Sequence, residues 1–209
     1  MLFLLSLFWL FLFFLYLLGG LKFEGEYLDG RRWNGKGYNK DGKLEFEIKN
    51  GKGHIKEYNQ DGKLLFDGEY LNGVRHGKGK EYSYIYQLMF EGEYLYGERN
   101  GKGKEYYYNG KLKFEGDYLN GKRNGKGKEY KLGAFEGTVS FKGEYKNGKR
   151  NGKGIGEQFR GEYKDGKRWN GIVTEYISGD ELYKIKNGNL LIEKFNKFER
   201  IFLWRYISI

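Results

Sequence analysis

The sequence contains no cysteine and no proline, and it has only two histidines among 209 residues. The absence of cysteine excludes a disulfide framework and any thiolate metal site. It also removes the usual indicator of redox compartment. With no proline, the turns of the chain depend on glycine, of which there are 35.

Aromatic, glycine and charged residues dominate what is present. The chain has 20 Tyr and 16 Phe, and 32% of its residues are charged. This composition indicates many short strands joined by glycine turns, and its aromatic content argues against disorder. A formal net charge of +10 and a pI near 9.4 favour anionic partners, namely membrane phosphates, nucleic acid or acidic proteins. Nucleic acid is disfavoured because no groove-reading helix or nucleic-acid module accompanies the charge.

Residues 1–20 form an apolar segment. From Met1 to Leu18, nothing is more polar than Ser6 and Tyr16. A helix of this length spans about 27 Å, against a hydrocarbon core of about 30 Å. We therefore predict an N-terminal apolar helix that anchors the chain in a membrane.

The flanks of the apolar segment favour an anchor over a cleaved signal peptide. No Lys or Arg precedes the segment, and Leu17 and Leu18 make a poor cleavage site before Gly19 and Gly20. A cleaved signal and a wrongly assigned start remain the alternatives. The first positive charges follow the segment, which places the repeats on the cytoplasmic side of the membrane. Secretion is the alternative location.

One phrase recurs along the chain. Phe90 begins FEGEYLYGERNGKGKEY, and Phe114 begins FEGDYLNGKRNGKGKEY. Self-similarity of this length indicates a repeat architecture. The seven copies begin at residues 23, 46, 66, 90, 114, 141 and 159, and the copy at 46 is degraded.

These phrases resemble the MORN repeat, which has an aromatic residue, an x-Gly-x step, a second aromatic residue and an NGKxxGxG turn. The resemblance covers residues 23–188. It implies an elongated, single-layer antiparallel β-sheet, and roles in membrane tethering, cortical or cytoskeletal scaffolding and oligomerisation. The chain departs from the family in using Tyr where Trp is frequent at the second aromatic position. The repeat-defining residues are Gly68, Tyr70, Gly92, Tyr94, Gly103, Gly116, Tyr118, Gly143 and Tyr145.

Two glycine-containing dipeptides predict the strand register. Asn-Gly and Asp-Gly favour two-residue type I′ hairpin turns, in which both central residues have positive φ. Such a turn at Asp61-Gly62 sets Lys56 opposite Asp67. The same rule at Asn109-Gly110 predicts the pairs Gly103–Gly116, Lys104–Glu115 and Lys102–Asp117.

Alternation of side chains then gives the sheet two different faces. Phe114, Gly116 and Tyr118 share an aromatic face with Leu112, while the charged residues between them share the other face. We expect aromatic rings to lie across the glycine pairs. Seven hairpins at about 4.8 Å per strand predict a rod about 65 Å long.

Residues 189–209 follow the array. From Leu190 to Tyr206, apolar residues recur at helical spacing. We predict a short amphipathic helix that caps the open edge of the last strand. Insertion into a membrane surface would use the same pattern and is the alternative.

No catalytic, cofactor-binding or metal-binding residue is predicted, and the chain is expected not to be an enzyme. The carboxylates recur in register along strands instead of converging in a pocket. His76 stands where other copies have Asn100 or Asn124, so it is interpreted as a turn substitution. The GxG steps are repeat turns without the strand-to-helix context of a phosphate-binding loop.

Basic residues recur in the turn of nearly every copy. They are predicted to form a ribbon along one edge of the sheet, where each could contribute about 1 kcal/mol to contact with anionic lipid headgroups. The alternative is that they only solvate the turns. The candidate lipid-contact residues are Arg75, Lys78, Arg99, Lys102, Lys122, Arg123, Lys126, Lys149, Arg150 and Lys153.

The sequence therefore predicts a non-enzymatic, membrane-associated scaffold or tether that binds protein partners, with contact to anionic phospholipid as an additional role. Two other functions stay open. Rows of exposed aromatic residues on an exported repeat sheet could bind polysaccharide. Edge-to-edge or face-to-face pairing of the sheets could instead produce a self-assembling homo-oligomer.

Overall fold

The structure is a computed structural model that describes residues 23–133, 135, 137–173 and 181–194. The chain forms two compact units, residues 1–112 (unit 1) and residues 113–209 (unit 2). Unit 1 contains β1 (Phe23–Leu28), β2 (Arg31–Tyr38), β3 (Leu44–Lys49), β4 (Lys52–Tyr58), β5 (Leu64–Leu71), β6 (Val74–Tyr82), β7 (Leu88–Leu95) and β8 (Glu98–Tyr106). Unit 2 contains β9 (Leu112–Leu119), β10 (Lys122–Tyr130), β11 (Val139–Lys146), β12 (Lys149–Gly156), β13 (Phe159–Lys164), β14 (Lys167–Val173), β15 (Glu181–Lys186) and β16 (Asn189–Lys194).

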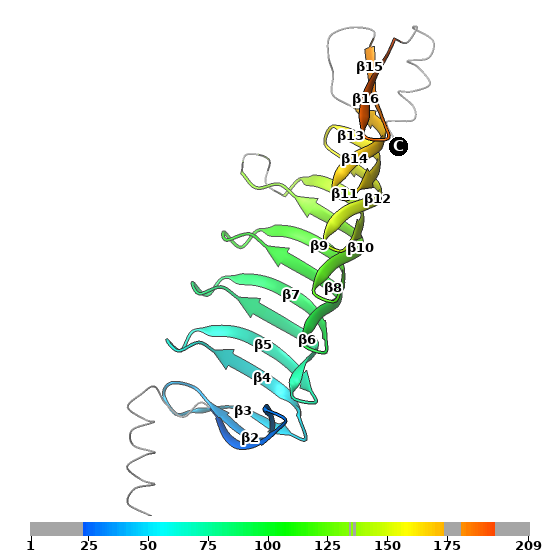
Figure 1. Cartoon of the computed structure of the whole chain (residues 1–209). Coiled ribbons are helices and arrows are strands. Elements are labelled where there is room, and N and C mark those ends of the chain that lie inside the picture. The colour runs from blue at the N-terminus through cyan, green and yellow to red at the C-terminus, as the bar shows by residue number, and fades with distance from the viewer. Residues whose placement is uncertain (1–22, 134, 136, 174–180, 195–209) are drawn as a thin grey trace, which may run out of the picture. The chain divides into compact units, whose positions relative to one another are not determined.

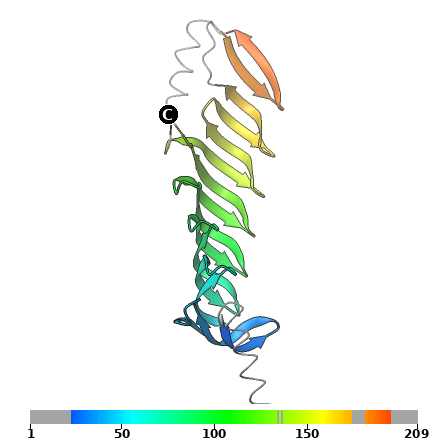
Figure 2. The same ribbon diagram turned by 90° about the vertical axis from the view of Figure 1, so that its left-hand side faces the viewer.

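Within each unit, the strands form an open antiparallel sheet in sequence order. Figures 1 and 2 show the strands of unit 1 following one another along a single layer. Two consecutive strands make one hairpin, and within a unit each hairpin pairs with the next. The described residues contain no helix, so the predicted all-β, hairpin-repeat sheet is confirmed for this part of the chain.

A type I′ turn closes each hairpin. Asn72 and Gly73 both have positive φ, at 54° and 70°, and Leu71 pairs with Val74 across them. Asn and Gly suit this turn because most other residues are strained at positive φ. The other turns of this kind are at Asp29-Gly30, Asn50-Gly51, Tyr96-Gly97, Asn120-Gly121, Asn147-Gly148, Asp165-Gly166 and Asn187-Gly188. We call the edge of each sheet that carries these turns the turn edge.

Backbone hydrogen bonds also join successive turns at the turn edge. The Gly97 N–H donates to the carbonyl of Arg75 in the preceding hairpin at 2.9 Å. The same bond links Gly148 to Arg123 at 2.8 Å and Gly166 to Arg150 at 2.9 Å. Within a unit, these bonds fasten a turn to the hairpin before it.

The connections between hairpins are different, and the predicted two-residue turns at Asp61-Gly62 and Asn109-Gly110 are wrong. In the first, only Gly62 has positive φ, and Asn59 N–H donates to the Lys63 carbonyl at 2.9 Å. The Asn59 side chain favours this longer loop because its Oδ1 accepts the Lys63 N–H at 2.8 Å. The loop 107–111 has the same backbone bonds. We call the edge that carries these connections the loop edge.

The predicted register nevertheless survives. Lys56 lies opposite Asp67, as expected. The longer loop and a β-bulge between Glu57 and Tyr58 offset each other, so the pairing beyond the bulge equals that of a two-residue turn. Three other predicted pairs would link a residue of unit 1 to a residue of unit 2, and they stay predictions. They are Gly103–Gly116, Lys104–Glu115 and Lys102–Asp117.

The core is a row of phenylalanine rings lying over paired glycines. Gly68 pairs with Gly79 across β5 and β6, and Gly79 pairs with Gly92 across β6 and β7. A Cβ at Gly68 would lie 2.7 Å from Cζ of Phe66, whose side chain is fully buried. The expected covering of glycine pairs by aromatic rings is therefore confirmed. The rings that fill these places are Phe66, Phe90, Phe114, Phe141 and Phe159.

Tyrosines at the second aromatic position join neighbouring hairpins. The Tyr94 ring meets Phe66 edge-on at 5.2 Å and Phe90 at 5.8 Å. Tyr145 lies in the same way between Phe114 and Phe141. Phe114 and Tyr118 are both buried, which confirms the predicted aromatic face of their strand.

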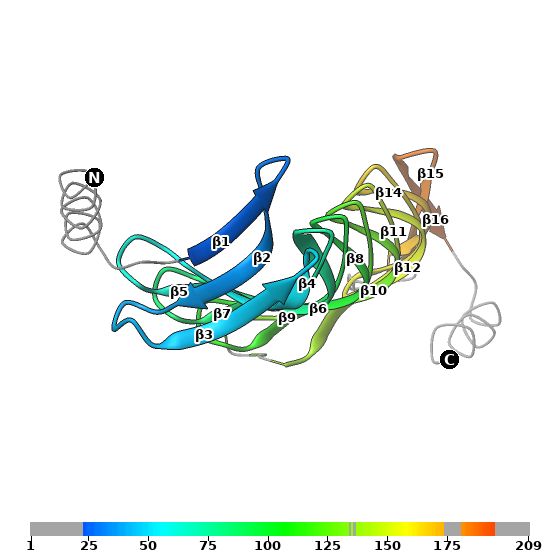
Figure 3. The same ribbon diagram turned by 90° about the horizontal axis from the view of Figure 1, so that it is seen from below.

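A β-bulge interrupts most hairpins between the second aromatic residue and the glycine pair. In β10, residues 124–126 lie opposite Asp117 alone. Asp117 Oδ2 accepts the Lys126 N–H at 2.9 Å, and Gly125 has a φ of +89°. Figure 3 shows the resulting curvature of the hairpins, viewed from below.

The degraded copy at residue 46 replaces glycine with isoleucine. Ile48 and Ile55 are buried and pack with Phe46 in one cluster. Ile55 lies opposite Gly68 of the next hairpin. Aliphatic side chains thus fill the volume that aromatic rings fill elsewhere.

The predicted C-terminal helix is wrong over residues 190–194, which lie in β16 and pair with β15. The Asn187-Gly188 turn pairs Lys186 with Asn189 and so begins a further hairpin. The array therefore extends beyond residue 188. The rest of that predicted helix, and the apolar helix predicted in residues 1–20, lie outside the described residues. In the described part of the chain, no helix is long and apolar enough to cross a membrane.

Candidate interaction surfaces

The arginines predicted to contact lipid are half-buried and stack on the core phenylalanines. The Arg75 guanidinium lies 4.0 Å from the centre of the Phe66 ring, and Arg99 lies 4.1 Å from Phe90. Unit 2 repeats this contact, with Arg123 at 4.0 Å from Phe114 and Arg150 at 4.2 Å from Phe141. Stacking of this kind stabilises both groups where water is partly excluded.

Each of these arginines also binds a glutamate. Arg99 pairs with Glu81 of the preceding hairpin, and Arg75 Nη2 lies 2.6 Å from Oε2 of Glu57. The Tyr94 hydroxyl donates to Glu81 at 2.7 Å. In unit 2, Glu129 accepts hydrogen bonds from Arg123, Arg150 and the Tyr145 hydroxyl. The arginines of the predicted ribbon therefore have partners inside the sheet.

Electrostatics within these clusters favour the charged carboxylates. Burial would raise the pKa of Glu81, but its bonds to Arg99 and Tyr94 outweigh burial and hold the pKa below its ordinary value. Burial would also raise the pKa of Glu129, but its hydrogen bonds to Arg150 and Tyr145 outweigh burial and lower that pKa as well. Burial and the neighbouring carboxylate raise the pKa of the Tyr94 hydroxyl. The clusters are thus stable ion pairs near neutral pH.

The lysines of the predicted set have a different position. They are exposed, and they either follow the glycine of the bulge or flank a type I′ turn. Lys153 N–H, for example, donates to Glu144 Oε2 at 3.3 Å while its side chain is exposed. The exposed lysines of the predicted set are Lys78, Lys102, Lys122, Lys126, Lys149 and Lys153.

The turn edge of unit 2 brings several lysines together. Lys146 lies opposite Lys149, and Lys164 lies opposite Lys167. Directly opposed like charges in a sheet are destabilising. These pairs concentrate positive charge at the turn edge of unit 2.

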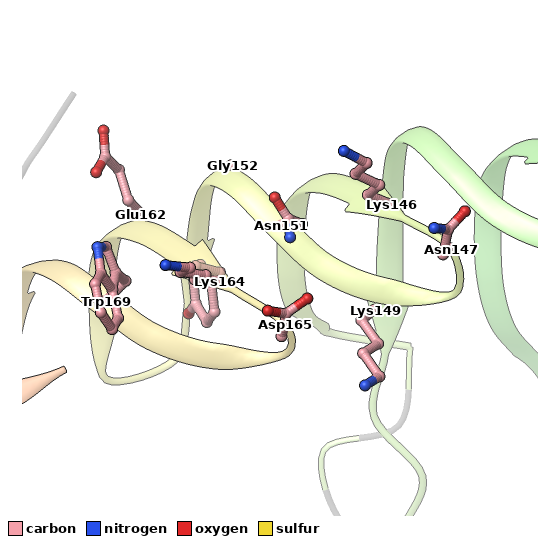
Figure 4. Close-up of a pocket in the computed structure, with 10 residues that line it drawn as sticks. Lys146, Asn147, Lys149, Asn151, Gly152, Glu162, Lys164, Asp165 and Trp169 are labelled. Carbon is pink, nitrogen blue, oxygen red and sulfur yellow. The ribbon is translucent and has the colours of Figure 1, made fainter. Parts of the chain in front are cut away.

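A hollow of about 610 Å³ lies between these two turns. Its lining includes Lys146, Lys149 and Lys164, together with Glu162 and Asp165. Figure 4 shows Lys164 beside Trp169, and their side chains stack with 4.4 Å between Nζ and the ring centre. Lys146, Lys164 and Trp169 are not among the residues predicted from the sequence, although the phrases KNGK and KDGK contain the two lysines.

The two histidines lie apart from this hollow. His54 is exposed on β4 and contacts Asp67 of β5, while His76 is half-buried in β6. Among the described residues, no three His, Asp or Glu side chains are arranged to hold a metal ion. Neither histidine is joined here to a cluster of acids.

Four stretches of the chain match the family model of the MORN repeat: residues 66–85, 90–111, 114–131 and 141–155. They correspond to the hairpins β5–β6, β7–β8, β9–β10 and β11–β12. No curated protein matches the chain.

Proposed function

Because the chain contains MORN repeats, we propose that it is a non-enzymatic scaffold or tether that binds protein partners and is held at a membrane. The observation that carries this proposal is that arginine and glutamate side chains of the sheet form the same pairs from repeat to repeat. Arg99 and Arg150 are matched to Glu81 and Glu129 in the same way in both units. Polar groups that recur in such matched sets build a regular surface, whereas catalysis requires unlike groups that converge on one substrate.

Membrane association rests on residues 1–18, whose composition suits a helix that crosses the bilayer. The positive charges that follow support a cytoplasmic location of the repeats. The test is to fractionate cells that make the full chain with a tag at Ile209. We expect the tag in the membrane fraction, resistant to high salt and sensitive to protease only after the cells are opened. Recovery in the soluble fraction would overturn the membrane tether, and recovery in the medium would favour export and polysaccharide binding.

Contact with anionic lipid is a second candidate role, favoured by the opposed lysines of unit 2. Their attraction to a charged bilayer is screened within about 8 Å at physiological ionic strength, so it should be salt-sensitive. Deletion of residues 1–20 should release the protein from membranes in high salt and leave binding to anionic vesicles in low salt. If the deleted form ignores anionic vesicles in low salt while retaining its β-sheet circular dichroism, the lipid-contact role fails and the protein scaffold stands alone.

The scaffold role itself predicts partners on the sheet surface. Proximity labelling is performed with the tagged full chain, in which Lys146 and Lys149 are intact, and with a variant in which His54 is replaced by Asn. Both chains should mark the same proteins. Size measurement of the purified full chain in detergent distinguishes self-assembly, which would give a mass well above one chain plus its micelle. A chain that labels no protein reproducibly would contradict the scaffold role.

A further inference from the structure

The loop 83–87, which joins β6 to β7, has the same frame as the other loop-edge connections of unit 1. Ser83 N–H donates to the Gln87 carbonyl at 2.8 Å, as Asn59 N–H does to Lys63. The Ser83 hydroxyl accepts the N–H groups of Ile85 and Gln87 at 3.3 and 3.2 Å. The side chains of Asn39 and Asn59 perform this task in loops 39–43 and 59–63. Formation of the loop therefore does not depend on the side chains at its tip.

The tip of this loop departs from its siblings in two ways. Tyr86 has a φ of 62°, at the position where the sibling loops have Gly42, Gly62 and Gly110. A side chain at positive φ is strained, and glycine would remove that strain. In addition, Tyr84, Ile85 and Tyr86 are 70%, 64% and 62% exposed. The tip of this loop thus combines a strained backbone at Tyr86 with three large apolar side chains that are exposed to the surroundings.

Lysines border this tip. Lys63 of the neighbouring loop holds its Nζ 5.6 Å from the centre of the Tyr86 ring. One loop further along, the Lys40 side chain passes over Gly62, with Cδ 3.2 Å from the position of a Cβ there. The connecting loops of unit 1 therefore lie side by side, and Figure 1 shows those after β4 and β6 projecting from the same edge of the sheet.

We propose that the tip Tyr84–Tyr86 inserts into the interfacial region of a lipid bilayer. Tyrosine rings favour the headgroup level of a membrane, an isoleucine between them can enter the acyl chains, and flanking lysines reach back to phosphate. A projecting turn with three apolar residues offers too little area for a stable protein interface, but it suffices for a shallow anchor that supplements another attachment. This inference rests on the proposed membrane tether, which holds the chain close to the bilayer.

The absence of cysteine permits a direct test on the full chain. Ile85→Cys places a single thiol at the tip, and Asp61→Cys places one at the equivalent turn of the sibling loop. Each is labelled with a polarity-sensitive fluorophore and reconstituted into phosphatidylcholine vesicles, with and without nitroxide-labelled acyl chains. Neutral lipid removes the attraction of the lysines. We expect a blue shift and strong quenching for the label at residue 85, and water-like emission without quenching for the label at residue 61.

A companion variant separates insertion from folding. Tyr84→Ser with Tyr86→Gly, added to Ile85→Cys, removes the two rings and the strain at residue 86. It should melt at the same or a higher temperature and lose most of the quenching. Full quenching in this variant would overturn the role of the tyrosines.

The remaining outcomes are distinguishable. Vesicles that carry the full chain but leave residue 85 in water overturn the loop anchor and leave the tether standing. A chain that does not float with vesicles at all overturns the tether, and the loop anchor with it. A blue shift in detergent-free solution without vesicles shows that protein covers the tip, as in self-association, and also overturns the proposal.

Discussion

Arg99 and Glu81 form an ion pair that joins strand β8 to strand β6, with β7 lying between them in the sheet. The same guanidinium covers the ring of Phe90, and Tyr94 donates to the same carboxylate. One charged pair therefore connects two hairpins and closes over the core. Because such contacts reach only the adjacent hairpin, stability should propagate by nearest-neighbour interactions.

Replacement of Glu81 with Gln should destabilise β7 and β8 locally. The change leaves the Arg99 charge without its carboxylate, and a hydrogen bond to a charged group contributes about 1.5–3 kcal/mol. Hydrogen exchange should show faster opening in β6–β8 and little change in β1 and β2. Glu24→Gln is the matched control, because Glu24 is exposed and accepts only a 3.3 Å bond from Tyr38 in the described structure. Equal effects of both variants would contradict the role of the Glu81 cluster.

The fold should lose stability at both ends of the pH scale. The pKa of Glu81 and that of Glu129 are lowered from 4.5, so their contribution is present above about pH 4.5 and is lost as the pH falls through the folded-state value. The pKa of the Tyr94 hydroxyl is raised from 10.0 in the folded state. Its contribution to folding stability is therefore complete below pH 10.0 and is lost as the pH rises above that value. Thermal melting should show a plateau from about pH 5 to about pH 9. Tyr94→Phe should flatten the alkaline decline, and an unchanged decline would contradict this assignment.

Gly92→Ala should be more harmful than Gly110→Ala. A Cβ at Gly92 would lie 2.7 Å from both the Gly103 Cα and the Phe90 Cζ. Overpacking of this kind costs about 1–3 kcal/mol or more, because backbone and ring must both shift. Gly110 has open space around its Cβ position and a φ of +79°, so alanine there carries only the strain of about 1–2 kcal/mol. Urea titration monitored by tyrosine fluorescence would rank the two, and the reverse order would contradict the glycine-pair core.

The turn-edge lysines should show opposite effects on folding and on lipid binding. Lys149→Glu and Lys167→Glu each replace a repulsive cross-strand pair with an attractive one, which should stabilise unit 2 by about 0.2–1 kcal/mol per pair. The same changes should weaken binding of the chain lacking residues 1–20 to anionic vesicles in low salt. Lys43→Glu on the loop edge is the control of equal charge change. If that control weakens binding equally, net charge rather than the turn edge governs the attraction.

Periodicity made the fold predictable, and the predicted pair Lys56–Asp67 is correct because the longer loop and the β-bulge offset each other. The alternation of Phe114, Gly116 and Tyr118 defined the buried face, and the glycine at every repeat defined where rings could lie. The turn type was predicted at the wrong dipeptides, because local preference cannot tell Asp61-Gly62 from Asn72-Gly73. At Asp61-Gly62 the Asn59 side chain, which accepts the Lys63 N–H, favours the longer loop.

The candidate surface was harder to derive than the fold. Arginine and lysine were counted together as one basic ribbon, yet the arginines turn onto Phe rings and bind Glu81 and Glu129. Their guanidinium groups are planar and stack well, whereas lysine heads favour water. The sequence shows that both residue types recur, but the glutamates that pair with Arg75, Arg99 and Arg150 come from the preceding copy. That contact depends on the hairpin-to-hairpin register.

The fastening of each turn to the hairpin before it makes the two edges unequal as sites for inserted sequence. A residue added beside Gly97 or Gly166 would break a bond to the preceding hairpin and shift the register of its own strand pair. Among the described residues of the loop edge, no backbone bond of this kind links successive connections, and the segment between β10 and β11 is already longer than loops 39–43 and 59–63. Epitopes, protease sites or whole domains grafted into that segment should therefore leave the repeats on both sides folded, which makes it the natural handle for engineering this protein.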